Sequence, residues 1–171
     1  MSIILKHICA WCQQELVKYK KSSKHDRISH GICETCAENF LNDSPQQLLD
    51  YLDDLHIPVL LVDQDGKIIR SNQNASKKIG KKIDQIVGYR GGEVFDCVHA
   101  NLEGGCGHTI YCSDCTIRQS VNETYSTGNS IINRTAYLTV CREGISRREK
   151  ILISTEKLGN LVLLKVESIS E

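Results

Sequence analysis

The sequence predicts an α+β fold, in which one five-stranded antiparallel sheet with flanking helices follows a small metal-stabilised module. Two observations lead to this prediction. Segments with strand and helix patterns follow one another as two strands, several helices and three strands, an order typical of an antiparallel α+β domain. Eight of the nine cysteines fall into two groups of four that contain C-x2-C pairs, which indicates two metal or thiol centres. The 171 residues therefore divide into an expected module over 1–42 and a domain over 45–168.

The first cysteine group predicts the module. Its pattern, C-x2-C-x20-C-x2-C, is typical of a four-thiolate zinc site and consists of Cys9, Cys12, Cys33 and Cys36. The surrounding segment carries few large apolar residues, and a piece this short needs a metal or disulfides to fold. We therefore expect zinc at this N-terminal site. The basic insert over 18–27, between the two pairs, is interpreted as a solvated loop, with contact to an anion or a partner as the alternative.

The second cysteine group lies in a glycine-rich stretch and has the pattern C-x8-C-x5-C-x2-C, formed by Cys97, Cys106, Cys112 and Cys115. The last two lie at the expected start of a helix, where peptide dipoles favour the thiolate over the thiol. Nearby glycines would let the backbone turn tightly enough for the four side chains to converge, and would leave amides free to bond the sulfurs. The predicted cofactor is zinc or an iron–sulfur cluster, since the spacing does not decide between them.

Three hypotheses follow for this second site. It is a redox-sensitive cluster, or a zinc site whose thiolates are oxidised and release the metal, or a structural zinc that pins a long loop. His99 and His108 flank the cysteines and are interpreted as surface or core residues, with ligation as the alternative. Cys141 belongs to neither group and is expected to be a small buried residue of a strand.

A helix is expected to open the domain. Ser44, Pro45 and Gln47 have the pattern of a capped helix start, and leucines recur at helical spacing as far as Leu55. This apolar stripe is either buried in its own domain or pairs with a second copy of the chain.

Strands and further helices follow this helix. The Asp65-Gly66 turn predicts a hairpin of strands over 58–62 and 67–71, and Asn72 or Asn74 is expected to cap the next helix. Glycine-punctuated short helices and loops come next. The remaining expected elements are a helix over 113–125 and strands over 131–141, 150–156 and 158–167.

The order of these elements, together with the segments IPVLLVDQDGKI (57–68) and SNQNA (71–75), resembles a PAS domain over about 45–167. The stretches FDCVHA (95–100), GGCG (104–107) and CSDCTIR (112–118) are similar to a cysteine-rich subgroup of bacterial PAS proteins. ICAWC (8–12) with SHGICETC (29–36) looks like the zinc-ribbon-like module found in bacterial signalling proteins. The resemblance implies a sensory and dimerisation domain that binds a cofactor or small ligand between sheet and helices.

The expected function is that of a cytoplasmic, non-catalytic sensor or adaptor, which passes the state of the second cysteine centre to a signalling protein partner and forms a homodimer. Lys plus Arg equals Asp plus Glu at 21 each, so nucleic acid is not expected as a partner. No apolar run is long enough to predict a membrane span. The alternatives are a structural zinc-binding interaction module without redox sensing and a dithiol oxidoreductase, which lacks the usual βαβ context here.

Cationic side chains near the second cysteine group are interpreted as solvated helix surface. They are Arg118 and lysines 77, 78, 81 and 82, and contact with a partner protein is the alternative.

Overall fold

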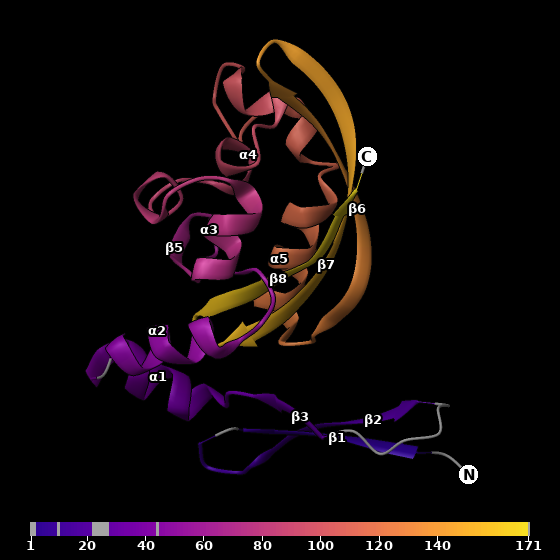
Figure 1. The fold of residues 1–171 in the computed structure, drawn as a ribbon. Coiled ribbons are helices and arrows are strands. Elements are labelled where there is room, and N and C mark those ends of the chain that lie inside the picture. Colours follow the sequence, from indigo (N-terminus) through magenta and orange to yellow (C-terminus); the bar gives the residue numbers. More distant parts are fainter. Residues whose placement is uncertain (1–2, 10, 22–27, 44, 171) are drawn as a thin grey trace. The chain divides into compact units, whose positions relative to one another are not determined.

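The computed structural model describes residues 3–9, 11–21, 28–43 and 45–170. The chain divides into two compact units, Met1–Leu48 and Leu49–Glu171 (Figure 1). Each unit contains one of the two cysteine groups. The division falls inside helix α2 (Pro45–Asp54), a few residues after the expected boundary at 42–45. The expected cap, Ser44, lies outside the described residues.

The N-terminal unit contains a three-stranded sheet that the sequence analysis did not predict. Its strands are β1 (Ile3–Cys9), β2 (Glu15–Lys21) and β3 (Ile28–Gly31), in the order β2-β1-β3. Strand β1 pairs antiparallel with β2 and parallel with β3. The expectation of a solvated loop over 18–27 is therefore wrong for 18–21, which belong to β2, while 22–27 lie outside the described residues. Helix α1 (Glu34–Asp43) follows β3.

The second unit confirms the predicted fold class. Its strands are β4 (Val59–Val62), β5 (Ile68–Ser71), β6 (Ile131–Arg142), β7 (Ile145–Leu158) and β8 (Leu161–Ser170). They form one antiparallel sheet in the order β5-β4-β8-β7-β6. Strand β8 lies between the β4–β5 hairpin and the long β6–β7 hairpin, so the last strand of the chain is the central strand of the sheet.

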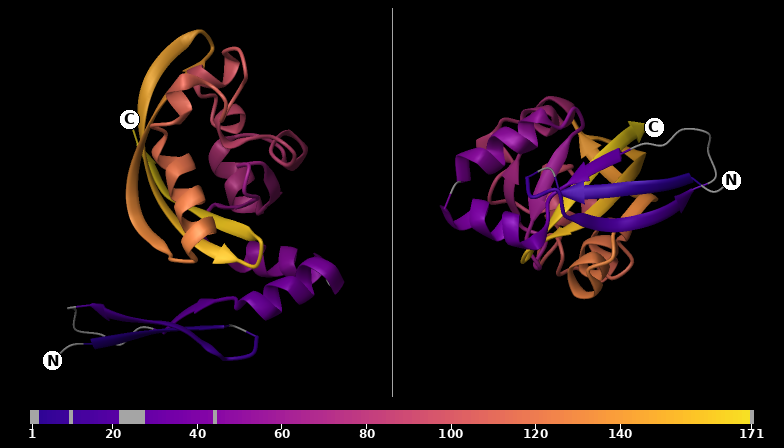
Figure 2. Two further views of the ribbon diagram at one scale, coloured as in Figure 1. Left: turned by 180° about the vertical axis from the view of Figure 1, so that it is seen from behind. Right: turned by 90° about the horizontal axis from the view of Figure 1, so that it is seen from below.

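Helices and short 3-10 turns lie between β5 and β6 in sequence. They are α3 (Gln73–Ile79), η1 (Ile83–Gln85), α4 (Gly91–Val94), η2 (Val98–Asn101), η3 (Ile110–Cys112) and α5 (Thr116–Thr127). Figure 2 shows α5 lying along one face of the sheet. The core forms on this face, where strand residues such as Leu60 and Ile153 pack with Phe95, Ile117 and Val121.

Strand β7 is longer than predicted. It starts at Ile145 rather than at 150, and pairs with β6 from Arg142 onward. The connecting residues Glu143 and Gly144 both have positive φ, at 53° and 77°, which suits the twist of a two-residue hairpin turn. The sequence over 145–150 is almost entirely polar and exposed, so it lacks the alternation by which a half-buried strand is predicted.

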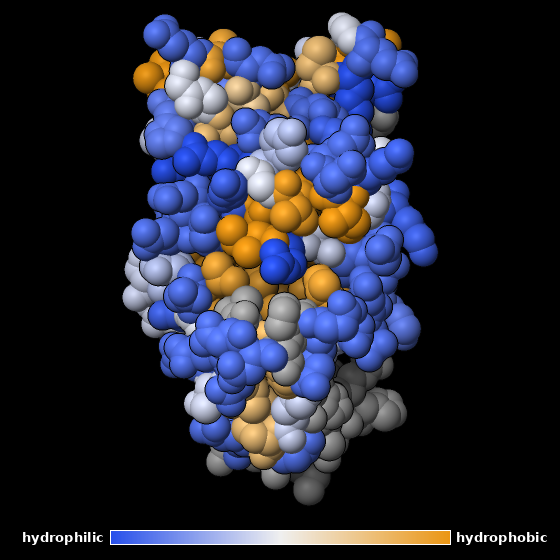
Figure 3. Space-filling model, turned by 90° about the vertical axis from the view of Figure 1, so that its left-hand side faces the viewer, coloured by the Kyte–Doolittle hydropathy of each residue, from blue (hydrophilic) through white to orange (hydrophobic). Residues whose placement is uncertain are grey.

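Several large apolar side chains of the second unit are exposed, among them Ile110, Tyr111, Ile132, Tyr137 and Ile145. Figure 3 shows one face of the molecule, mostly hydrophilic, with hydrophobic side chains gathered near its middle. Among the described residues, no helix combines the length and the apolar character needed to cross a bilayer.

Candidate functional site

The N-terminal unit brings its four cysteines together. Cys9 ends β1, Cys12 lies in the turn before β2, Cys33 precedes α1 and Cys36 lies in the first turn of α1. Their four sulfur atoms all lie within 4.8 Å of one another. A Zn–S bond of about 2.3 Å in a tetrahedron places sulfurs about 3.8 Å apart, so little movement is needed to hold one zinc ion.

Backbone geometry supports this arrangement. The Gln13 amide donates to the Cys9 carbonyl, which closes the turn that carries Cys12, and the Cys36 amide donates to the Cys33 sulfur at 3.4 Å. The second pair thus lies at the start of a helix, and not in a second β-hairpin turn. The four-cysteine site agrees with the sequence analysis, whereas the zinc-ribbon-like character of the module stays a prediction.

Two thiols of this group have pKa values shifted in opposite directions. Burial raises the pKa of Cys9, but the amides of Cys12, Cys33 and Trp11 outweigh it and lower this pKa to about 6. Burial and the neighbouring thiols raise the pKa of Cys36 to about 12. Adjacent thiolates repel one another, so a cation at the centre of the group is the simplest way to hold all four as thiolates.

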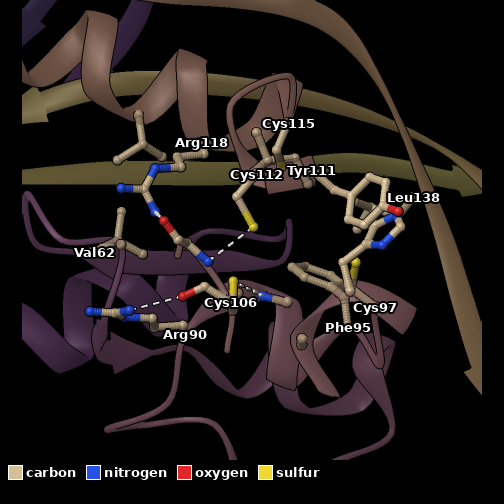
Figure 4. Close-up of a pocket in the computed structure, with 18 of the residues that line it drawn as sticks. Val62, Arg90, Phe95, Cys97, Cys106, Tyr111, Cys112, Cys115, Arg118 and Leu138 are labelled. Carbon is tan, nitrogen blue, oxygen red and sulfur yellow. Dashed lines mark hydrogen bonds between the residues drawn. The ribbon is translucent and has the colours of Figure 1, made fainter. Parts of the chain in front are cut away.

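In the second unit, a cavity of about 360 Å³ opens beside the core, between the sheet and the segments that connect β5 to β6. All four cysteines of the second group line it: Cys97, Cys106, Cys112 and Cys115. Figure 4 shows them around one space, on three different segments of the chain. Apolar side chains complete the wall, among them Val62, Phe95, Ile117 and Leu138.

Two peptide amides hold two of these sulfurs. The Gly92 amide donates to the Cys106 sulfur at 3.2 Å, and the Gly107 amide donates to the Cys112 sulfur at 3.1 Å. Gly107 has φ +91°, a conformation that glycine adopts without strain. The expectation that glycines turn this loop and free its amides for the sulfurs thus agrees with the structure. The role of Gly92 was missed, because it lies 14 residues from its sulfur in sequence.

The sulfurs of the second group are spaced differently from those of the first. Among the described residues, the N-terminal cysteines are the only group of three or more His, Cys, Asp or Glu residues whose ligand atoms all lie within 4.8 Å of one another. The expected convergence is therefore looser than a zinc-sized cluster, although the four residues share one cavity.

Local contacts shift the pKa values of this group in both directions. Burial raises the pKa of Cys97 and of Cys106. Burial also acts to raise the pKa of Cys112, but the Thr109 hydroxyl, the Gly107 amide and the nearby charge of Arg118 outweigh it and lower this pKa. The surrounding protein thus favours the thiolate of Cys112 over its thiol.

Two arginines that line the cavity support the cysteine loop. Arg90 Nη1 donates to the Cys106 carbonyl at 2.8 Å, and Arg118 Nη1 donates to the Gly107 carbonyl at 2.5 Å. Arg118 therefore does not lie on a solvated helix surface as expected. Arg90 was not identified from the sequence, because nothing in its local pattern indicates that it reaches a loop 16 residues away.

An ion-pair chain fixes the backbone next to Cys97. Asp96 pairs with Lys81 at 2.6 Å and with Arg142 at 3.1 Å, and Arg142 also pairs with the buried Glu149 at 2.7 Å. The Asp96 carbonyl accepts from the Cys141 amide on strand β6. These contacts tie the segment that carries Cys97 to the sheet, so the expectation that Lys81 is merely solvated is also wrong.

Of the two histidines that flank the second cysteine group and the ninth cysteine, only His99 lines the cavity. His99 lines the cavity and its ring stacks on Tyr111 at a centroid distance of 4.3 Å, whereas His108 is exposed. Cys141 lies on β6, is partly buried and is not among the residues of the cavity wall.

We expect Gly92→Ala to weaken metal binding at the second cysteine group. An added Cβ would lie 2.7 Å from the Cys106 sulfur, so the sulfur must move. Losses of supporting contacts typically cost roughly 10- to 100-fold in metal affinity, to be measured by competition with a chelator. Gly91→Ala is the matched control, because a Cβ at Gly91 meets nothing within 4 Å. Equal affinities of the two variants would contradict the role assigned to this contact.

No protein-family model matches the sequence, and no curated protein matches it. Solved structures do match. The PAS domain of nitrogen regulation protein NR(II) from Vibrio parahaemolyticus is 14% identical, with 71% of this chain and 96% of that chain covered and a TM-score of 0.45. A LOV protein from Rhodobacter sphaeroides is 12% identical, with 71% and 64% covered and a TM-score of 0.48.

A domain of a sensory box sensor histidine kinase/response regulator from Geobacter sulfurreducens is also similar, at 12% identity, with 73% of this chain and 95% of that chain covered and a TM-score of 0.47. Likeness at identities this low does not extend to ligand or activity. The chain's own elements define its fold: a PAS-like five-stranded antiparallel sheet with flanking helices, which follows a four-cysteine unit in the sequence.

Proposed function

We propose that this chain is a cytoplasmic signalling sensor or adaptor without catalytic activity, in which the second cysteine group forms a metal or redox centre. The single observation that carries the proposal is the placement of four cysteines around one cavity beside the core. A purely structural zinc would not require a cavity at this place. All nine cysteines are free thiols, as suits a reducing compartment.

The first cysteine group has a structural role in this proposal. Its sulfurs already lie at nearly the spacing that zinc requires, and zinc is redox-inert at the metal. The division of labour is therefore a closed zinc site in the N-terminal unit and a responsive centre in the PAS-like unit.

The route by which the centre alters a protein contact runs through η3. This turn carries Cys112 together with Ile110 and Tyr111, which are 82% and 52% exposed. A change at the Cys112 sulfur therefore acts directly on a segment that presents apolar side chains to solvent. Exposed apolar side chains support protein contacts, and we propose that a second copy of the chain and a signalling partner both use this part of the unit.

Cys112→Ser/Cys115→Ser tests the proposal. We expect the double variant to lose the metal of the second centre while retaining one zinc at the N-terminal site. A four-coordinate centre loses most of its metal affinity when two of its four thiolate ligands are removed. Metal content per chain and the monomer–dimer equilibrium before and after exposure to air are the measurements. Cys141→Ser is the control and should behave as the wild type.

Retention of the second metal by the double variant, together with an unchanged response to air, would overturn the proposal. A wild-type chain that carries metal at the second centre but shows no change of association in air would leave the structural alternative in its place.

A further inference from the structure

The sulfurs of the second centre are more widely spaced than those of the first, and this spacing indicates which kind of metal cofactor the second centre binds. A single zinc ion draws four thiolates to about 3.8 Å from one another, and the N-terminal group nearly has that spacing. The second group does not, and its cysteines line a cavity of about 360 Å³. An iron–sulfur core places inorganic sulfide and several irons between its thiolate ligands, so those ligands stand further apart.

The hydrogen bonds to the sulfurs favour this wider arrangement. Cys106 is held by the amide of Gly92 in α4, and Cys112 by the amide of Gly107. Each of these two sulfurs is thus held by a different segment of the chain. Amide donors to cysteine sulfur are also among the contacts by which proteins set the potential of iron–sulfur clusters.

Charge is the second, independent observation. The Nη1 atoms of Arg90 and Arg118 converge on Gly107: a Cβ added there would collide with the latter and lie 3.5 Å from the former. Among the described residues, neither guanidinium forms an ion pair with a carboxylate. Asp65 and Asp114 also line the cavity, but both are exposed to solvent. The two neighbouring guanidinium groups repel one another, so an anionic ligand in the cavity would stabilise their arrangement.

A thiolate-bound cluster is such an anionic ligand. Four thiolates around a doubly positive cluster core carry two negative charges in total, and a buried charge is costly unless opposite charges lie beside it. The two guanidinium groups supply those opposite charges. Apolar side chains such as Phe95 and Leu138 form part of the cavity wall, beside polar ones such as Asn122.

We propose that Cys97, Cys106, Cys112 and Cys115 hold a polynuclear iron–sulfur cluster, with Arg90 and Arg118 as positioning residues that balance its negative charge. This inference rests on the proposed function, in that it names the cofactor of the same centre. Electron uptake by the cluster adds negative charge, so the two arginines raise its midpoint potential.

The full-length chain is to be reconstituted without oxygen, with iron(III), a thiol reductant, sulfide and two equivalents of zinc. We expect one zinc per chain, iron and acid-labile sulfide in equal amounts, and a visible chromophore that bleaches in air. Two zincs without sulfide would overturn the cluster but leave the metal centre of the proposed function intact. One zinc with four reactive thiols in the second group would overturn both, and an organic chromophore extracted without iron would overturn the cluster.

The arginines are tested on the reconstituted chain by titration with dithionite. We expect Arg90→Gln and Arg118→Gln to shift the midpoint potential to more negative values, and Arg118→Lys to retain most of the wild-type potential. Arg70→Gln is the control, because Arg70 donates to a backbone carbonyl but does not line the cavity. If the Gln variants lose iron without any shift of the potential of the remaining cluster, the arginines only shape the loop and their charge role is wrong.

Discussion

Asn72→Ala is expected to lower the free energy of unfolding of the PAS-like unit by about 3–5 kcal/mol, the upper range for a single substitution. The Asn72 side chain is 1% exposed. Its Oδ1 accepts from the amides of Val59 and Ala75 at 2.9 and 2.8 Å. Its Nδ2 has two hydrogens and donates to the carbonyls of Leu52 and Ile57 at 2.8 and 2.9 Å, with the Leu55 carbonyl at a longer 3.3 Å. Alanine removes this partner from all of these groups, of which the Leu55 carbonyl keeps Asn74 as a donor, and each buried group left unsatisfied costs roughly 1–3 kcal/mol.

The neighbouring Asn74 supplies the matched control. Its Nδ2 donates to the Leu55 carbonyl alone, and the residue is only partly buried. We expect Asn74→Ala to cost about 1 kcal/mol or less. Denaturant unfolding, at fixed metal content, measures both variants. A cost for Asn72→Ala no larger than that for Asn74→Ala would show that the network around Asn72 does not stabilise the unit.

Those parts of the fold that depend on local sequence were predictable. The Asp65-Gly66 turn places its hairpin where the structure has β4 and β5, and the choice of Asn72 or Asn74 as helix cap includes the residue that caps α3. In both cases the signal and the structure it specifies lie within a few residues of each other.

Elements that depend on pairing with distant segments were not predictable. The start of β7 is polar and is a strand because it pairs with β6 across the hairpin. Strand β1 pairs with β3 in parallel, a contact that no local periodicity indicates. The N-terminal unit was expected to be loop-rich because its cysteine spacing predicts a metal centre but does not predict the secondary structure between the cysteines.

The residues of the candidate centre likewise include some that were predictable from the sequence and some that were not. The spacing predicted two groups of four cysteines, of which the structure brings the sulfurs of the first together and places the second around one cavity. Arg90, Gly92 and Thr109 were not predicted, because glycine, threonine and arginine are common and acquire their role only through the tertiary contact with a sulfur or a carbonyl. The sequence pattern therefore identifies the candidate ligands, whereas the residues that hydrogen-bond to their sulfurs and carbonyls are identified only by the fold.

The largest expected effect concerns the first cysteine group: Cys9→Ser/Cys33→Ser should unfold the N-terminal unit and leave the PAS-like unit folded. Among the side chains whose burial the structure describes, the buried apolar ones in this unit are Ile32, Ala37, Phe40 and Leu48 besides the cysteines. Structural zinc supplies on the order of 10 kcal/mol to modules of this kind, and a unit this short needs such a contribution to fold.

Amide hydrogen exchange measured by segment distinguishes the two units in the full-length chain. The double variant should lose protection in β1, β3 and α1 while β6, β7 and β8 keep theirs, and Cys141→Ser should lose none. Cys9 and Cys33 are both buried and lie at the end of β1 and just before α1, so a zinc ion held by both would link these two elements. Full protection of β1 and α1 in the double variant would mean that packing alone folds this unit and that zinc is dispensable there.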